Sequence, residues 1–556
     1  MWQKILSYIP DWTIFMQAGF CLLIPIAFIA LINKLRAVFK GIEGKNGDGG
    51  TSGDVQAVDK NDPPLSADYE NNRSAIKEAI GSNCDVHFRD FEIAALQKRA
   101  TLIYVDGMIA EEHIDTQVMQ AFMSAAEPDA KHGLKAQAPD DFSAYLIKNM
   151  LPASEVTEET GLISLNEAIL NGYTALLVEG MPHALLVGAP DGKTRSISEP
   201  ISEGLVRGPR TGFSEQLSDN TAILRRQGRT EQLEMKKYVV GNVVKRDLVL
   251  AYMKDIVNPE LLREVEKRIA NIDLDFIAES GYVEQLIEDD ILSPFQQAQN
   301  TERPDRVMSA LMDGRIAILL DGTPFALIVP VTFSMLLQSP EDYYERWIGG
   351  SLLRLLRFVA AFLALMAPSL YISFISFHPG LIPTDLAITI IQARQRVPFP
   401  SLIEILILEV SIEILREAAI RLPRPIGPAM GIVGGLIIGE AAVQAGIVSP
   451  FLVIVVSVTA VASFSIPMYS TGITLRILRF AGMFFAAALG ILGTILFFLF
   501  MSSHLTRLKS FGVPYVTPIS PFRIRDWKDL FIRAPLNLMK RKPQMMKTIR
   551  RKSRTH

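Results

Sequence analysis

The sequence predicts a polytopic membrane protein, in which an α-helical membrane bundle is joined to a cytoplasmic α/β domain made of two related subdomains. Three observations predict this fold class. From Gly350 to Ser502 long runs contain no Lys, Arg, Asp or Glu, whereas Asp54 to Arg346 has the mixed composition of a soluble protein. A second uncharged run, Trp12 to Ile32, precedes the soluble part. Within the soluble part, two stretches repeat one another. The net charge of -3 therefore results from unlike regions that cancel.

Residues 1–40 are predicted to form an N-terminal transmembrane anchor, followed by a flexible linker over residues 41–66. About 20 apolar residues in a helix cross the hydrocarbon layer of a bilayer, and Trp12 to Ile32 has this length. The basic residues Lys34, Arg36 and Lys40 follow this run instead of preceding it, and no A-x-A site occurs, which disfavours a cleaved signal peptide. The linker is rich in Gly, Ser, Asp and Asn and has too few apolar side chains for a core.

Basic residues set the expected orientation, because the cytoplasmic flanks of membrane helices are enriched in Lys and Arg. Lys34, Arg36 and Lys40 follow the first apolar run, and residues 504–556 form a strongly basic tail. We therefore expect the middle domain and the tail to lie in the cytoplasm. The tail is also expected to contact membrane lipid, since polybasic segments bind anionic headgroups.

Two cytoplasmic α/β subdomains, residues 67–205 and 206–350, are predicted from an internal repeat. Residues 169–187 and 311–329 align without a gap at their small, apolar and turn positions. Each copy is an apolar run, an acidic residue with Gly, and a second apolar run, which is typical of a β-hairpin. The alternative is a chance resemblance between two unrelated hairpins.

Residues 351–503 are predicted to form the transmembrane bundle. Five apolar segments are candidate crossings: Phe358 to Phe377, Ile403 to Ile420, Gly427 to Val448, Phe451 to Ile473 and Phe480 to Met501. An even number of crossings is required if both flanks are cytoplasmic. We expect the acidic helix that begins at Ser401 not to span by itself, because its charges cannot face lipid. Alternatively, Leu381 to Arg394 completes a crossing.

Enzymatic activity is not expected. The cytoplasmic domain has no P-loop, G-x-S-x-G, HExxH or kinase motif. The two Cys and seven scattered His cannot assemble a recognisable metal site. We predict no catalytic residue, no cofactor, no metal and no nucleic-acid partner.

A stripe of glycines predicts close helix packing within the bundle. Gly427, Gly431, Gly435 and Gly439 recur every fourth residue and so share one face of a helix. Glycines on such a face let a neighbouring backbone approach closely. The stripe predicts a homo-oligomer assembled around this helix, or alternatively packing within the bundle of one subunit.

Carboxylates in the apolar region are candidates for an ion pathway. They are Glu409, Glu413, Glu417 and Glu440. The first three share a helix face at i, i+4 spacing. A carboxylate at membrane depth costs several kcal/mol unless it meets water or a partner, and symmetric rings of carboxylates line cation pathways. The alternative is a set of salt bridges with the nearby cations Arg416, Arg421 or Arg476.

Several short motifs carry a resemblance to a known family. They are Gly208-Pro-Arg-Thr-Gly-Phe-Ser-Glu215, Asn220-Thr-Ala-Ile-Leu-Arg225, Thr301-Glu-Arg-Pro-Asp305, Glu341-Asp-Tyr-Tyr-Glu-Arg346, Val397-Pro-Phe-Pro400 and Glu413-Ile-Leu-Arg-Glu-Ala418. With these motifs the chain resembles the GerA-type spore germination proteins, and in particular the A subunits of nutrient germinant receptors. The motif residues carried over are Pro209, Arg210, Glu215, Asn220, Arg225, Arg303, Pro304 and Asp305.

The resemblance implies a component of a complex in the inner membrane of bacterial endospores. It implies a transporter-like B subunit and a lipoprotein C subunit as partners, and an oligomer that conducts or gates ions to trigger germination. A non-conducting membrane scaffold and a sporulation-stage paralogue of the A subunit are the alternatives. The predicted anchor and linker are additions to the usual beginning of the family.

Overall fold

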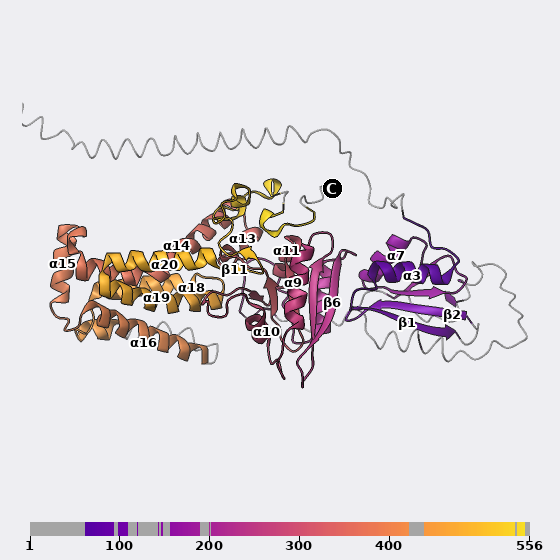
Figure 1. Cartoon of the computed structure of the whole chain (residues 1–556), viewed down its shortest axis with the longest axis horizontal. Helices are drawn as coiled ribbons and strands as arrows, with labels where there is room; N and C mark the ends of the chain where they lie inside the picture. The colour runs from indigo at the N-terminus through magenta and orange to yellow at the C-terminus, as the bar shows by residue number, and fades with distance from the viewer. Residues whose placement is uncertain are drawn as a thin grey trace, which may run out of the picture. The chain divides into compact units, whose positions relative to one another are not determined.

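The computed structural model describes residues 62–93, 98–108, 119, 143, 146–147, 156–188, 199–200, 202–421, 439–539 and 542–550. The predicted anchor, nearly all of the predicted linker, and Gly427, Gly431 and Gly435 lie outside the described residues. From Pro63 onward the chain forms one compact unit. In this unit two α/β subdomains are followed along the chain by a helical bundle (Figure 1).

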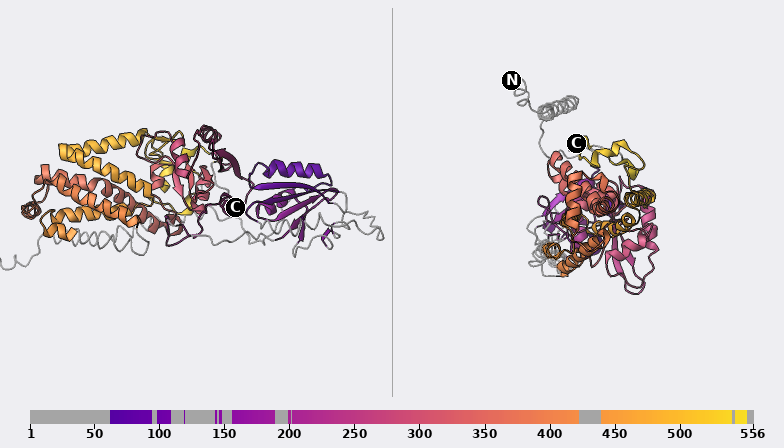
Figure 2. Two further views of the ribbon diagram at one scale, coloured as in Figure 1. Left: turned by 90° about the horizontal axis from the view of Figure 1, so that it is seen from below. Right: turned by 90° about the vertical axis from the view of Figure 1, so that its left-hand side faces the viewer.

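The first subdomain is built on a five-stranded antiparallel sheet with the order β1-β2-β4-β5-β3. Its strands are β1 (Val86–Ile93), β2 (Lys98–Val105), β3 (Val156–Glu159), β4 (Thr174–Val178) and β5 (Ala184–Val187). Helices α3 (Tyr69–Ile80) and α7 (Leu162–Leu170) cover one face of this sheet (Figures 1 and 2). Ile76 of α3 and Ile169 of α7 share a fully buried cluster with Ile103 of β2.

The second subdomain repeats this topology, with the order β6-β7-β9-β10-β8. Its strands are β6 (Leu233–Val240), β7 (Arg246–Met253), β8 (Gln299–Thr301), β9 (Ile316–Leu320) and β10 (Ala326–Val329). Helices α8 (Leu217–Gln227) and α11 (Pro304–Met312) share one apolar core with the sheet. Helices α9 (Pro259–Ala270) and α10 (Ser280–Ile287) share a second apolar core with the same sheet.

The internal repeat predicted from the sequence is confirmed by this shared topology. Each repeated stretch contains the end of a helix and the two strands of a hairpin, namely β4 and β5 or β9 and β10. The two hairpin turns place Gly180 and Gly322 at φ of +84° and +82°. Residues with a Cβ avoid this backbone conformation, so the aligned glycines are required by the turn.

The repeat also includes the helix that opens each subdomain, which the sequence motifs did not reveal. Before α3, Ser66 N donates to Asn72 Oδ1 at 2.9 Å, and Asn72 Nδ2 donates to Ser66 O at 2.7 Å. Before α8, Ser214 and Asn220 form the same two hydrogen bonds, both at 2.7 Å. The motif residue Asn220 therefore fixes a helix start, and this Ser-x5-Asn pair was the missed sequence signal.

The bundle contains α14 (Trp347–Ile372) with its π-helical extension η3 (Ser373–Phe377), α16 (Ser401–Arg421), α18 (Pro450–Phe464), α19 (Tyr469–Leu489) and α20 (Ile491–Arg507). Within the described residues, two helices are long and apolar enough to cross a membrane: 347–377 and 469–489. Helices α18 and α20 are apolar but shorter. Helices α14, α19 and α20 run alongside one another (Figure 1).

The predicted boundaries of the last two crossings are wrong. The apolar run 451–473 is divided, because α18 ends at Phe464 and α19 begins at Tyr469. Pro467 lies between them, and proline disfavours the helical conformation at the residue before it. The run 480–501 is divided at Gly490, which has a φ of +62°. Both turns are made of apolar or small residues, so hydropathy alone does not reveal them.

The connection between α14 and α16 contains η4 (Pro379–Leu381) and α15 (Thr384–Arg394). Helix α15 lies across the ends of the bundle helices instead of running alongside them (Figures 1 and 2). Residues 381–394 therefore do not continue a neighbouring helix through the bundle.

The basic tail packs against the second subdomain. It contains β11 (Lys509–Ser510), β12 (Val513–Pro514) and the 3-10 turns η5 (Ile524–Asp529), η6 (Leu536–Leu538) and η7 (Gln544–Met546). Tyr515 is fully buried and donates to the carbonyl of Gln296 at 2.7 Å. Arg550 pairs with Asp255 at 2.6 Å. Part of the tail's positive charge, predicted to face lipid, is therefore used in protein contacts.

Candidate functional site

Charged side chains meet in the interior of the bundle between α16 and α19. Glu409 pairs with Arg479 at 2.8 Å, and both side chains are only 1% exposed. Glu413, one turn further along α16, pairs with Arg476 at 2.8 Å and with Arg479 at 3.1 Å. Two of the four predicted pathway carboxylates therefore point toward arginines of the same subunit.

Arg416 links this group to a third helix. Its guanidinium is 3.3 Å from Glu413, donates to Ser463 Oγ of α18 at 3.1 Å, and lies over the ring of Phe464 at 4.8 Å. We call Glu409, Glu413, Arg416, Arg476 and Arg479 the charged cluster. When all are ionised, two carboxylates and three guanidiniums leave one net positive charge.

The charged cluster is held together but is not fully hydrogen-bonded. Glu409 Oε1, Arg416 Nε and Arg479 Nε have no hydrogen-bond partner within the described part of the chain. A buried charge is costly in an apolar medium. Removing one partner of a buried ion pair costs more free energy than keeping the pair, because the other charge is then left unpaired. The cluster is therefore a strong contact between three helices that retains unused donors and acceptors.

The other two predicted carboxylates lie elsewhere. Glu417 is 61% exposed and pairs with Arg421 one turn away at 2.6 Å. Glu440 is exposed and accepts from Gln444 Nε2 at 3.1 Å. The four carboxylates thus do not form one surface in a single subunit, and the salt bridges considered as the alternative are present for Glu413 and Glu417.

Gly439 is the only member of the predicted glycine stripe within the described residues. It is buried, and a Cβ added to it would lie 3.5 Å from Val453 Cγ1 of α18. At this position the stripe therefore packs within its own subunit. The role of Gly427, Gly431 and Gly435 in an oligomer stays a prediction.

The motif residues of α11 connect the second subdomain to the start of the bundle. Arg303 is 1% exposed and donates to the carbonyls of Pro209 at 2.7 Å and Glu203 at 3.3 Å. It also pairs with Asp305 at 3.1 Å, which accepts a hydrogen bond from the Tyr344 hydroxyl of α13 (Glu341–Tyr344). These residues thus attach a loop and the segment before α14 to one helix of the subdomain.

The remaining motif residues have simpler roles. Pro304 occupies the first turn of α11, where its missing N–H has no helical partner to lose. The Glu215 carbonyl accepts from the N–H of Gly322 at 2.8 Å. Arg210 is 77% exposed and 3.9 Å from Glu199, so the described structure gives it no buried role.

Arg225 joins the two subdomains. It is fully buried in α8, and its guanidinium donates to both Asp85 oxygens at 2.9 Å and to Asn83 Oδ1 at 3.1 Å. The N–H of Met235 in β6 also donates to Asn83 Oδ1, at 3.0 Å. The carbonyl of Met235 accepts from the N–H of Cys84 at 2.9 Å. Sequence reasoning selected Arg225 but missed its acidic partner.

A second missed group lies where α14 begins. Asp342 and Arg354 are fully buried and 3.3 Å apart, and Asp342 also pairs with Arg357 at 2.6 Å. Arg354 reaches Asp529 of the tail at 2.7 Å. We call Asp342, Arg354, Arg357 and Asp529 the junction cluster.

Among the described residues, no group of three or more His, Cys, Asp or Glu is arranged to hold a metal ion.

Two carboxylates, one in α10 and one at its C-terminal end, have altered acidity. Burial and, to a smaller extent, the neighbouring carboxylate of Glu288 raise the pKa of Glu284 to about 7. Burial likewise raises the pKa of Glu288. The Gln296 side chain donates to Glu284 at 3.2 Å, and the Gln296 carbonyl accepts the hydrogen bond from Tyr515 of the tail.

We expect the contribution of protonated Glu284 to the stability of the fold to be lost as the pH rises from about 5 to about 7. The folded-state pKa of Glu284 exceeds its usual value of 4.5, so the folded protein binds this proton more tightly and loses that advantage when the group ionises. Thermal unfolding at about pH 5 and about pH 8 measures the effect. In Glu284→Gln the difference between the two pH values should shrink, whereas in the exposed control Glu260→Gln it should not. An undiminished difference in Glu284→Gln would contradict this assignment.

The fold and these clusters define a class: a membrane protein whose duplicated soluble α/β domain is tied by buried ion pairs to a helical bundle with charges in its interior. A model of the Bacillus/Clostridium GerA spore germination protein family matches residues 74–545. The chain belongs to this family. The membership confirms the resemblance to A subunits of germinant receptors, and with it the expectation of a protein that is not an enzyme.

Individual relatives cover most of the chain. Spore germination protein GerLA of Bacillus cereus is 40% identical over 473 residues, 85% of this chain and 94% of the relative. The uncharacterized membrane protein YfkQ of Bacillus subtilis (strain 168) is 41% identical over 485 residues, 87% of this chain and 92% of the relative. Spore germination protein A1 of the same organism is 48% identical over 378 residues, 68% of this chain and 78% of the relative.

One solved structure is also similar. It is the crystal structure of the N-terminal domain of the A subunit of the Bacillus megaterium spore germinant receptor GerK3. The sequences are 31% identical, and the match covers 49% of this chain and 99% of that chain with a TM-score of 0.38.

Proposed function

We propose that this chain, as the A subunit of a spore germinant receptor, assembles with B and C subunits in the spore inner membrane and gates an ion pathway as a homo-oligomer. Family membership and the names of the relatives support the receptor role. The observation that carries the gating role is the charged cluster between α16 and α19. Ionisable groups inside a membrane bundle are costly, and where they persist they usually serve ion movement or switching.

The geometry favours a latch over a pore lining for this cluster. In one subunit Glu409 and Glu413 face Arg476 and Arg479, so they hold α16 against α19 and do not face an aqueous channel. Movement of α16 away from α19 would separate the pairs and expose carboxylates at membrane depth. We therefore propose that the closed state has the pairs formed and that a signal from the partner subunits, passed through the soluble subdomains, breaks them.

A measurement of ion flux distinguishes a charged cluster that holds the closed state from one that lines the ion pathway. The chain is reconstituted with its B and C subunits in liposomes, and basal monovalent cation flux is followed without germinant. If the pairs hold the closed state, Glu409→Gln should raise basal flux about tenfold, which corresponds to about 1.4 kcal/mol lost from that state. Exposed Glu417, whose pair with Arg421 lies outside the cluster, provides the matched control Glu417→Gln, for which we expect no change.

Each other outcome has a definite meaning. Lower cation flux in Glu409→Gln would show that the carboxylate lines the path and would contradict the latch. Absence of flux in every variant, with partners present, would favour the non-conducting scaffold. The oligomer is tested separately by cross-linking, because Gly435→Leu should weaken subunit association if the glycine stripe forms an interface between subunits.

A further inference from the structure

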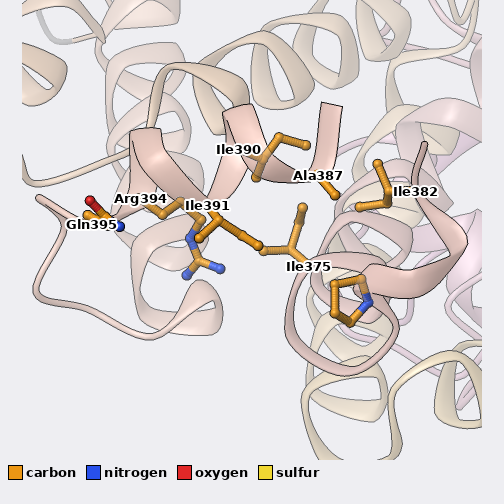
Figure 3. Close-up of a pocket in the computed structure, with 8 residues that line it drawn as sticks. Ile375, Ile382, Ala387, Ile390, Ile391, Arg394 and Gln395 are labelled. Carbon is orange, nitrogen blue, oxygen red and sulfur yellow. The ribbon is translucent and has the colours of Figure 1, made fainter. Parts of the chain in front are cut away.

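The connection between α14 and α16 forms an open cavity of about 240 Å³, bounded by η3, η4 and α15 (Figure 3). Half of its lining residues are isoleucines, namely Ile375, Ile382, Ile390 and Ile391. One cation, Arg394, also lines it. This volume is far larger than the roughly 10–15 Å³ that a single ordered water requires.

In a bilayer crossed by residues 347–377, the cavity would lie at the membrane surface remote from the soluble subdomains. Residues 347–377 form one helical segment of 31 residues, or about 46 Å at about 1.5 Å per residue, which matches a bilayer with its headgroups. This segment starts beside α13 and ends at η3, so α15 lies at the far surface. Leu386, Ile388 and Ile391 of the transverse helix α15 are 45%, 50% and 54% exposed, so this helix carries apolar side chains that the described protein does not bury.

The Arg394 guanidinium is only loosely held by the protein. Its side chain is 21% exposed, and its ion pair with Glu404 Oε2, the one that the described residues offer it, measures 3.5 Å. Within the described residues Arg394 Nε has no hydrogen-bond partner. Glu404 is fully buried, and its other oxygen accepts from Ser449 N at 2.5 Å, so this carboxylate is fixed in place by α18. Arg394 therefore places a partly exposed positive charge at the edge of a largely apolar cavity.

We propose that this cavity binds an anionic phospholipid of the leaflet on the far side, with the phosphate on Arg394 and part of an acyl chain along the isoleucine wall. Charge complementarity selects the occupant, since a guanidinium binds phosphate through paired, charge-assisted hydrogen bonds. The ion pair with Glu404 already joins α15 to the first turn of α16, so the phosphate would share the Arg394 guanidinium with this carboxylate. This site is separate from the charged cluster and does not depend on whether the bundle conducts ions.

Lipid retention on the full chain tests the site. The protein is purified in detergent and titrated with phosphatidylglycerol or phosphatidylcholine, and bound lipid is counted by native mass spectrometry. We expect wild type to bind one phosphatidylglycerol at least tenfold more tightly than phosphatidylcholine. Arg394→Gln should weaken that binding about tenfold. Ala387→Phe, which fills the cavity without changing charge, should weaken it as well.

The controls separate the site from general surface charge and from small phosphates. Exposed Arg396, two residues away and outside the cavity lining, provides Arg396→Gln, for which we expect unchanged binding. Equal losses in Arg394→Gln and Arg396→Gln, or no loss in both Arg394→Gln and Ala387→Phe, would overturn the proposal. So would competition by free glycerol phosphate at the concentrations at which phosphatidylglycerol binds. The melting temperature of each variant shows whether it is folded. If Arg394→Gln is not folded, lipid binding by Ala387→Phe decides the test.

Discussion

Arg225→Gln is expected to lower the free energy of unfolding of the soluble part by about 3–5 kcal/mol. The guanidinium is fully buried and donates both to Asp85, which is 1% exposed, and to the Leu233 carbonyl at 2.8 Å. Glutamine removes the charge, so Asp85 is left buried without its cation. The two subdomains should also separate more readily, because Arg225 belongs to α8 and Asp85 to the segment before β1.

Urea denaturation and limited proteolysis of the purified chain measure this effect. Exposed Arg229, one turn further on, provides the matched control Arg229→Gln, which should change stability by less than about 0.5 kcal/mol. In the double variant Arg225→Gln with Asp85→Asn, the loss should be smaller than the sum of the single losses, since no lone charge is left buried. Additive losses, or a change in Arg225→Gln as small as that of the control, would show that the pair does not hold the subdomains together.

The sequence predicted features that depend on neighbours along the chain. The two hairpins were visible because their turns need Gly180 and Gly322 at positive φ and their strands are short apolar runs. Arg225 was recognised from its motif, but its partner was not, because Asp85 lies 140 residues earlier in the sequence. Pairing over such a separation is decided by how the subdomains pack, which local patterns do not encode.

The same limit explains the bundle. Composition correctly predicted an apolar helical region and acidic residues within it. It did not predict the rotation of α16 about its own axis, which decides which residues face the bundle interior. It therefore grouped Glu409 with Glu417, although the side chain of the first is 1% exposed and that of the second 61%. A helix rotation is fixed by contacts with other helices, here by Arg476 and Arg479 of α19. The helix break at Gly490 was hidden for a similar reason, because a single glycine in an apolar run is compatible with both packing and a turn.

The junction cluster is the place where the soluble domain, the bundle and the tail meet. Asp342 follows the first residue of α13, Arg354 and Arg357 lie in the first turns of α14, and Asp529 ends η5 of the tail. The Tyr343 hydroxyl also donates to Asp529 at 2.5 Å. Gly350 allows this close approach, since a Cβ there would lie 2.4 Å from the Asp342 carbonyl oxygen. The second subdomain, the tail and the start of α14 are therefore in direct contact at this cluster.

Asp342→Asn should weaken the link between the second subdomain and the start of α14 and, because Arg354 loses one of its two carboxylates, loosen the contact of Arg354 with Asp529 of the tail. Arg357 would lose its carboxylate and Arg354 would keep only Asp529, at an expected cost of about 3–5 kcal/mol for the buried charges. Thermal unfolding measures the loss, and tryptic cleavage after Lys528 or Arg533 reports release of the tail. Glu345→Gln is the control, because Glu345 and Arg207 are 3.9 Å apart and well exposed, so its loss should be below about 1 kcal/mol. In reconstituted receptors Asp342→Asn should also abolish the response of flux to the partner subunits while leaving the charged cluster intact. Retention of both tail protection and that response would show that the signal does not reach α14 through Asp342.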